Sequence, residues 1–216
     1  MPLLAFALVL LLSAWARPGQ AMAYAVVPLD DGRCGAACPQ AIYASGEIQF
    51  DEPQRLLSFV QQVGDGLSRT LVIHSPGGNL AGALKLGQGL RRLGMNVVVA
   101  SVGRAADGRA VLRPGRCASA CVFVLMGGET RMVPDGSRIF VHSPRRAGFD
   151  QRDIVDGGFL EQPTRPETVS AVLQHYARQM GIDPALVALA DAVPHESARE
   201  LTPAEIRRFR LASRRR

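Results

Sequence analysis

"TLVIHSPGGNLAGALKLGQGLRRLG", residues 70–94, is the stretch that decides the fold. Residues 70–75 form a short, mostly apolar run that is typical of a buried strand. The two glycines after Pro76 turn the chain, and Asn79 then caps a helix that ends at Gly94. A buried strand that passes through a glycine turn into a helix is the repeating unit of α/β domains.

The sequence on either side continues this alternation of strands and helices. We expect further strands at residues 46–50, 96–101, 130–133 and 138–143, with a glycine- and arginine-rich loop at 102–116. We expect helices at 51–63 (capped by Asp51), 121–126, 164–180 (with a capping box from Thr164 to Glu167), 183–193 and 202–211. The pattern predicts a single α/β domain with a mostly parallel sheet and C-terminal helices.

The N-terminal segment has the pattern of a secretory signal peptide. Residues 3–16 are almost entirely apolar, and Ala21, Met22 and Ala23 give the small-x-small pattern of a cleavage site. We therefore expect a signal peptide at 1–23, a cysteine-bearing leader at 24–43, the main domain at 44–212 and a basic tail at 213–216. This predicts a periplasmic or secreted protein; the alternative is an inner-membrane protein that keeps its N-terminal anchor.

The charge of the chain comes almost wholly from arginine. The formal net charge is +6, and Lys85 is the only lysine. A basic tail can contact nucleic acid or anionic lipid, but no basic stripe interleaved with aromatic residues accompanies it. We expect no nucleic-acid partner, no metal and no cofactor.

Four cysteines, Cys34, Cys38, Cys117 and Cys121, lie in two close pairs. In an exported protein they predict two disulfides, formed either within each pair or between the pairs. The C-x3-C spacing of the second pair is not that of a thioredoxin motif or a zinc ribbon. We therefore expect the sulfurs to brace the structure rather than to carry chemistry.

Three junctions that follow strands carry the residue types of acyl-transfer chemistry. They are "HSPGGN" (74–79), "CASAC" (117–121) and "SRIFVHSP" (137–144). A serine hydroxyl becomes a nucleophile when an imidazole takes its proton, and an oxyanion needs backbone N–H donors. Ser119 and His142 fit the first requirement, and the amides of Gly78 and Ala120 fit the second. Taken singly, Ser119 fits a helix cap and His142 a core histidine; the combination favours a site.

In these motifs the sequence resembles the proteolytic subunit of the Clp protease and the wider ClpP/crotonase superfamily, and looks closest to exported ClpP-like proteins of bacteria. "HSPGG" is similar to the family's "NSPGG", and "ASAC" to its nucleophile loop "ASM" or "ASA". "PDGSRIFVHSP" is similar to "PNSRxMIHQP", and "ELTPAEIRRFRLA" to "FLSAPEAVEYGLV". The similarity covers residues 44–212 and implies a ClpP/crotonase-like α/β fold.

By this resemblance, Ser119 is the nucleophile, His142 the general base, and Gly78 and Ala120 supply the oxyanion hole. The resemblance implies a serine peptidase that acts on a peptide or protein substrate and forms a homo-oligomer. The family's ATP-driven unfoldase is cytosolic, so an exported relative is expected to work without it.

The sequence departs from the family at the third triad member, where an aspartate is expected. Counting back from the C-terminal motif gives Ala198, while counting forward from Gly181 gives the region of Asp191. Asp191 is therefore the candidate, followed by Glu196 and Glu200. His195 lies close to this position in the sequence and could approach the site, but we expect it to be a loop residue.

Two further departures bear on mechanism and assembly. The sequence has no lysine after Lys85, which excludes the Ser–Lys dyad of related signal peptide peptidases. Glycines and prolines interrupt the segment after His142, where the family has the long handle helix of its double ring. The missing aspartate and the altered handle motivate an alternative function, a catalytically inactive ClpP-like binding or assembly module. An acyl-CoA enzyme of the crotonase type is a third option, which lacks a Ser–His pair.

Overall fold

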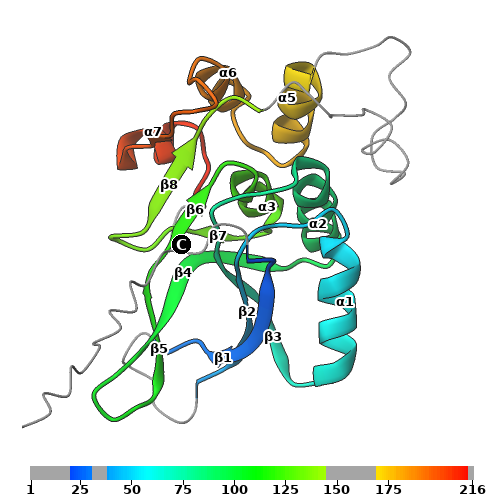
Figure 1. Cartoon of the computed structure of the whole chain (residues 1–216), viewed down its shortest axis with the longest axis vertical. Helices are drawn as coiled ribbons and strands as arrows, with labels where there is room; N and C mark the ends of the chain where they lie inside the picture. Colours follow the sequence, from blue (N-terminus) through cyan, green and yellow to red (C-terminus); the bar gives the residue numbers. More distant parts are fainter. Residues whose placement is uncertain (1–19, 31–37, 145–168, 214–216) are drawn as a thin grey trace, which may run out of the picture.

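The computed structural model describes residues 20–30, 38–144 and 169–213. Its strands are β1 (Ala23–Pro28), β2 (Gln40–Ser45), β3 (Leu67–His74), β4 (Asn96–Arg104), β5 (Ala110–Pro114), β6 (Arg116–Ala118), β7 (Arg131–Met132), β8 (Arg138–Val141) and β9 (Arg199–Glu200). Its helices are α1 (Glu52–Val63), α2 (Leu80–Arg92), α3 (Cys121–Gly127), α5 (Val169–Gln179), α6 (Ala185–Asp191) and α7 (Pro203–Arg208). Figure 1 shows α1 and α2 along one side of the strands, with α5, α6 and α7 gathered at one end.

The central sheet has the strand order β1-β2-β3-β4-β5, and β7 also pairs with β4. β2, β3, β4 and β7 run parallel to one another, while β1 and β5 add antiparallel strands. Each of β3 and β4 has a run of four consecutive buried residues, because helices cover the parallel part of the sheet. The prediction of a single α/β domain with a mainly parallel sheet is confirmed.

A smaller, three-stranded sheet has the order β6-β8-β9 and is formed by residues from the second half of the chain. β6 and β8 are parallel, with Ala118 opposite Phe140. An isolated parallel bridge between Ser75 and Cys117 connects this sheet to the end of β3. The carboxyl ends of β3, β6 and β8 are thereby brought to one place, where α/β folds gather ligand-binding residues.

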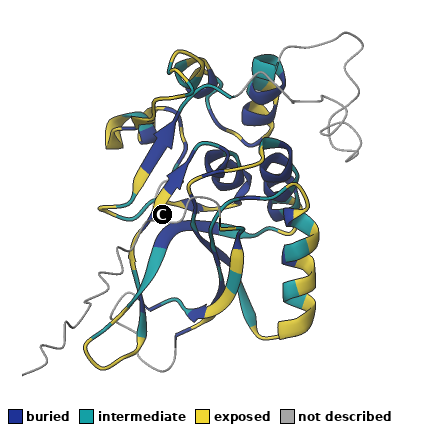
Figure 2. Cartoon of the chain, viewed as in Figure 1, coloured by how far each residue is buried: buried dark blue, intermediate teal, exposed yellow. Residues whose placement is uncertain are grey.

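Helices α2 and α3 pack against each other in the interior, where Figure 2 shows both as mainly buried. Their contact depends on two glycines, since a methyl group on Gly127 would lie 2.1 Å from the carbonyl oxygen of Gly87. Arg91 of α2 donates hydrogen bonds to the carbonyls of Met126, Gly127 and Gly128 at the end of α3. This rigid pair supports the junctions that precede each helix.

Three sequence-based expectations change at the strands. The predicted strand at 46–50 is reduced to isolated bridges at Glu47 and Ile48, while residues 23–28 and 40–45, expected in or next to the leader, form β1 and β2. The predicted loop at 102–116 contains the end of β4, all of β5 and the start of β6. β1 and β5 lie at the borders of the central sheet and have solvated faces, so they lack the continuous apolar run that marks β3.

The start of α1 differs from expectation in its hydrogen bonding. Asp51 occupies the cap position, but its side chain makes no capping hydrogen bond within the described residues. The buried carboxylate of Glu52 instead accepts from the Gln49 amide at 2.7 Å and from the Tyr24 hydroxyl at 2.8 Å. This carboxylate therefore ties β1 to the first turn of α1.

The C-terminal helices lie within the predicted ranges, but α6 ends at Asp191 and α7 at Arg208, before the predicted ends at 193 and 211. Thr202 and Glu205 form a reciprocal capping box at the start of α7. The capping box expected from Thr164 to Glu167 lies outside the described residues, which resume at Val169 in α5.

The region around the expected cleavage site packs into the fold. The Met22 side chain is fully buried, and its carbonyl accepts a hydrogen bond from Arg55. Cleavage after Ala23 would remove this core side chain.

Candidate active site

Ser119 occupies a turn of unusual backbone conformation between β6 and α3. Its φ is 56°, and only one other non-glycine residue in the described part of the chain, Arg210, has a positive φ. The left-handed region costs an L-residue roughly 1–2 kcal/mol, so the surrounding structure must hold it there. The Ser119 amide donates to the carbonyl of Phe140 at 2.9 Å, which ties the turn to β8. Strain at a serine between a strand and a helix is typical of an exposed nucleophile.

A disulfide between Cys117 and Cys121 closes a small ring around this turn, with a Cα–Cα distance of 5.3 Å. Both cysteines are fully buried. Cys38 is also disulfide-bonded, while Cys34 lies outside the described residues. The second pair is therefore joined locally, and the alternative of a cross-link between Cys117 or Cys121 and the first pair is wrong.

The glycine loop after β3 lies directly against Ser119. The Ser75 amide donates to the carbonyl of Arg116 at 2.9 Å, and the Ala118 amide donates back to Ser75 at 3.1 Å. A methyl group on Gly77, whose φ is 111°, would lie only 2.8 Å from the Ser119 Cβ. The "SPGG" and "CASAC" motifs thus form one compact unit, as their chemistry requires.

Two backbone amides near Ser119 have no partner in the described part of the protein. The N–H groups of Gly78 and of Ala120 donate to no acceptor there. Both residues line the same cleft as Ser119. Gly78 has a φ of 135°, and a methyl group there would lie 2.4 Å from the Ile48 carbonyl. Unpaired N–H groups that line a cleft next to a serine are what an oxyanion hole consists of.

His142 reaches this cleft from the end of β8. Because β6 and β8 are parallel, with Ala118 opposite Phe140, the residues that follow the two strands emerge on the same edge. Ser119 and His142 both line the cleft, and no hydrogen bond joins their side chains within the described residues. In unliganded hydrolases such bonds often form fully only when substrate binds.

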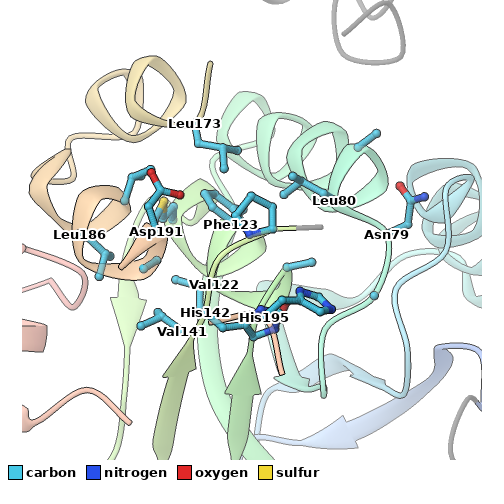
Figure 3. A pocket seen from close by; sticks show the side chains of 18 of the residues that line it. Asn79, Leu80, Val122, Phe123, Val141, His142, Leu173, Leu186, Asp191 and His195 are labelled. Atoms are coloured by element: carbon cyan, nitrogen blue, oxygen red, sulfur yellow. The ribbon is translucent and has the colours of Figure 1, made fainter. Parts of the chain in front are cut away.

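The carboxylates considered for the third position make other contacts. Asp191, at the end of α6, lines the cleft but accepts a short hydrogen bond from the Ser170 hydroxyl. Figure 3 shows it apart from His142, across the pocket. Glu200 pairs with Arg138, and this ion pair holds its pKa below the usual range. Neither Glu196 nor Glu200 lines the cleft.

Two polar cleft residues were not among the predicted site residues. The sequence position of His195 allowed an approach to the site but favoured a loop residue. Its ring packs edge-to-face on that of His142, with the centroids 4.7 Å apart. Glu47 also lines the cleft, beside Gly78. Neither residue belongs to a periodic pattern or a motif. The one sequence signal for His195 was its position near Asp191, and Glu47 had none.

The cleft has a volume of about 530 Å³ and is mostly apolar. Figure 3 shows its side chains converging from α2, α3, β8 and the C-terminal helices. The apolar part includes Leu80, Val122, Phe123, Met126, Leu173 and Leu186. Small-molecule and peptide side-chain sites have this composition, with a few polar groups in an apolar pocket.

His74, which precedes the glycine loop, does not line the cleft. Its Nδ1 accepts a hydrogen bond from the Arg116 amide at 3.0 Å. Burial, and then the positive charge of Arg116, lower the pKa of His74 from its ordinary value of 6.5. This histidine therefore joins β3 to β6 in its neutral form.

Within the described ranges, no group of three or more His, Cys, Asp or Glu side chains is placed to hold a metal ion. The same residues include no helix with the length and apolar character needed to cross a bilayer.

Comparisons with known proteins give similarity at the level of the fold. No protein-family model and no curated protein sequence matches the chain. A mutant of the 1510-N membrane-bound stomatin-specific protease aligns with 80% of this chain and 76% of its own, at 16% identity and a TM-score of 0.47. Another mutant, in complex with a substrate peptide, covers 80% and 72% at 17% identity and 0.47. ClpP1 from Listeria monocytogenes covers 80% and 88% at 13% identity and 0.48. These alignments report a likeness in fold alone, and the site is assigned from its own geometry.

Proposed function

We propose that this protein is a serine hydrolase that cleaves peptide bonds, with Ser119 as the nucleophile and His142 as the general base. The observation that carries the proposal is the joint position of three features. Ser119 is held in a strained turn, two unpaired amides flank it, and an imidazole enters the same cleft. Acyl transfer by a serine hydrolase uses an exposed nucleophile, donors for the oxyanion and a base, and these three features can supply them.

The reaction follows from the roles of these groups. His142 takes the proton of the Ser119 hydroxyl while the oxygen attacks the substrate carbonyl. The amides of Gly78 and Ala120 donate to the oxyanion that forms, and each such donor lowers the barrier by about 3 kcal/mol. His142 then gives the proton to the leaving amine, and water releases the acyl group from Ser119 by the same steps in reverse.

The shape and lining of the cleft support a peptide substrate. The apolar wall formed by Val122, Phe123 and Leu173 suits a substrate side chain, and the open amides suit a carbonyl. We infer that the protein works on flexible or unfolded peptides without an ATP-driven partner, because the N-terminal segment is typical of an exported protein.

A fluorophosphonate probe tests the proposal, because it reacts covalently with activated serines. The full chain is labelled beside Ser119→Ala and His142→Ala, with Ser101→Ala as a matched control. The Ser101 hydroxyl bonds to the Pro114 carbonyl and does not line the cleft. We expect labelling of wild type and Ser101→Ala only. Labelling that survives in folded Ser119→Ala would refute the assignment of the nucleophile.

One observation favours a second candidate, a binding module without catalytic activity. Asp191, the carboxylate expected to orient the base, is paired with Ser170 instead. A binding module would still use the open amides and the apolar wall to hold a peptide. Absence of labelling in correctly folded wild type, together with retained peptide binding, would select this alternative.

We also propose that the protein is exported. The apolar segment at residues 3–16 supports this proposal, and the buried position of Met22 predicts that a mature chain still contains that residue. Cell fractionation followed by N-terminal sequencing of the isolated protein tests both statements.

A further inference from the structure

The two imidazoles of the cleft lie next to each other, as Figure 3 shows. The ring planes of His142 and His195 meet at 81°, with the centroids 4.7 Å apart. His142 follows β8, whereas His195 lies between α6 and β9. Two segments that are far apart in the sequence therefore place imidazoles in direct contact, one of them on the base of the proposed function.

Both rings contact the same backbone carbonyl. The Nδ1 atom of His142 lies 2.8 Å from the carbonyl oxygen of Ser143, and the Nδ1 atom of His195 lies 3.0 Å from it. A carbonyl oxygen only accepts hydrogen bonds, so each contact requires a proton on Nδ1. In neutral His142 this leaves Nε2 with a free lone pair, which is the tautomer that a general base needs.

The segment that contains His195 also accepts a hydrogen bond from the amide N–H of Ser143. The Ser143 amide donates to the Val193 carbonyl at 2.9 Å. Ser143 is therefore fixed through its N–H by Val193 and through its carbonyl by His195. Residues 193–195 therefore hold both backbone polar groups of the residue whose carbonyl the His142 ring contacts.

We propose that His195 is a positioning residue for His142 and acts through the Ser143 carbonyl. In Ser–His hydrolases a third group accepts from Nδ1–H of the base and fixes its tautomer and angle. Here the Ser143 carbonyl is that acceptor, and His195 holds it in place and packs on the ring. Asp191 does not take this role, because the Nδ1 atom of His142 contacts the Ser143 carbonyl instead. The inference rests on the proposed function for its catalytic meaning.

Two substitutions separate the hydrogen bond from the packing. His195→Phe keeps an aromatic ring and removes the donor, whereas His195→Asn keeps an N–H donor and removes the ring. Glu196→Gln is the matched control, because Glu196 is next to His195 in the sequence and does not line the cleft. Asp191→Asn tests the competing carboxylate, which does line it. Each variant is measured by its second-order rate of fluorophosphonate labelling, and by ¹H–¹⁵N correlation spectra that report the tautomer of His142.

We expect His195→Phe to lower the labelling rate by about 10- to 100-fold, less than the roughly 10⁴-fold cost of a wrong tautomer. The His142 spectrum of this variant should show a mixture of tautomers. His195→Asn should retain a labelling rate within about threefold of wild type, because the donor to Ser143 is restored. Glu196→Gln should label at the wild-type rate, and Asp191→Asn should lose less of that rate than His195→Phe. His195→Leu repeats the donor-removal test if His195→Phe does not fold.

Wild-type labelling and an unchanged His142 spectrum in folded His195→Phe would overturn the inference. A loss in Asp191→Asn equal to that in His195→Phe would also overturn it, by giving the orienting role to the carboxylate. If wild type itself is not labelled, the proposed function fails. The tautomer spectra then still decide the positioning role: a mixture in His195→Phe supports it, and an unchanged spectrum refutes it.

Discussion

Removal of the Cys117–Cys121 disulfide should weaken both the fold and the nucleophile. The ring spans a sequence separation of only 4, so it constrains few residues in the unfolded chain. The loop-closure entropy of a ring of this size corresponds to about 2 kcal/mol. We expect Cys117→Ala/Cys121→Ala to lower the free energy of unfolding by about this amount, measured by urea denaturation.

The same double variant should react more slowly at Ser119. The left-handed conformation at φ 56° costs roughly 1–2 kcal/mol, and the ring that encloses it restricts the alternatives. If the turn relaxes by that amount, the reactive conformation becomes about 5- to 30-fold less populated, since 1.4 kcal/mol is a factor of ten. The fluorophosphonate labelling rate under native conditions should fall by the same factor.

The Cys34→Ala/Cys38→Ala variant is the matched control. Cys38 is disulfide-bonded but does not line the cleft. This variant should also lose stability, yet its labelling rate should equal that of wild type. Loss of stability in Cys117→Ala/Cys121→Ala without any loss of labelling rate would refute the reasoning, because the backbone alone would then hold Ser119.

Gly78→Ala should lower the labelling rate by about 100-fold or more, because a methyl group 2.4 Å from the Ile48 carbonyl displaces the amide that serves the oxyanion. A wild-type rate in the folded variant would exclude Gly78 from the oxyanion hole. His74→Asn should reduce the fall in the free energy of unfolding between neutral and acidic pH. Burial and Arg116 lower the pKa of His74 in the fold below 6.5, so its stabilising contribution is complete above pH 6.5 and is lost as the pH falls through the lowered value. Urea denaturation between about pH 7 and pH 5 should show a smaller loss for His74→Asn than for wild type, and equal losses would contradict this assignment.

The central βα unit could be predicted from the sequence because its signals are local. Residues 70–94 contain an apolar run, a glycine turn and a capped helix, and each of these depends only on neighbouring residues. β1 and β5 could not be predicted in the same way. Their strands are stabilised by pairing with β2 and β4, so the signal lies in the partner strand rather than in their own composition.

The residues of the candidate site also differ in how far they could be predicted from the sequence. Ser119, His142 and the glycine loop lie in local motifs, so they could be assigned to one candidate site from the sequence. The third group did not follow from spacing. Asp191 was the expected carboxylate, but it is bonded to Ser170, and His195 lies beside the base instead. Spacing along a loop does not fix the direction of a side chain, whereas a strand or a helix does.

The α/β class and the order of the three junctions could be predicted from the sequence, because strand periodicity, turn glycines and caps act over a few residues. Which of the candidate groups meet depends on tertiary packing. The parallel register of β6 with β8 brings Ser119 and His142 to one edge, and the Val193 and His195 contacts to Ser143 add a segment from the far end of the chain. Such contacts are set by the packing of distant elements, so no local pattern records them.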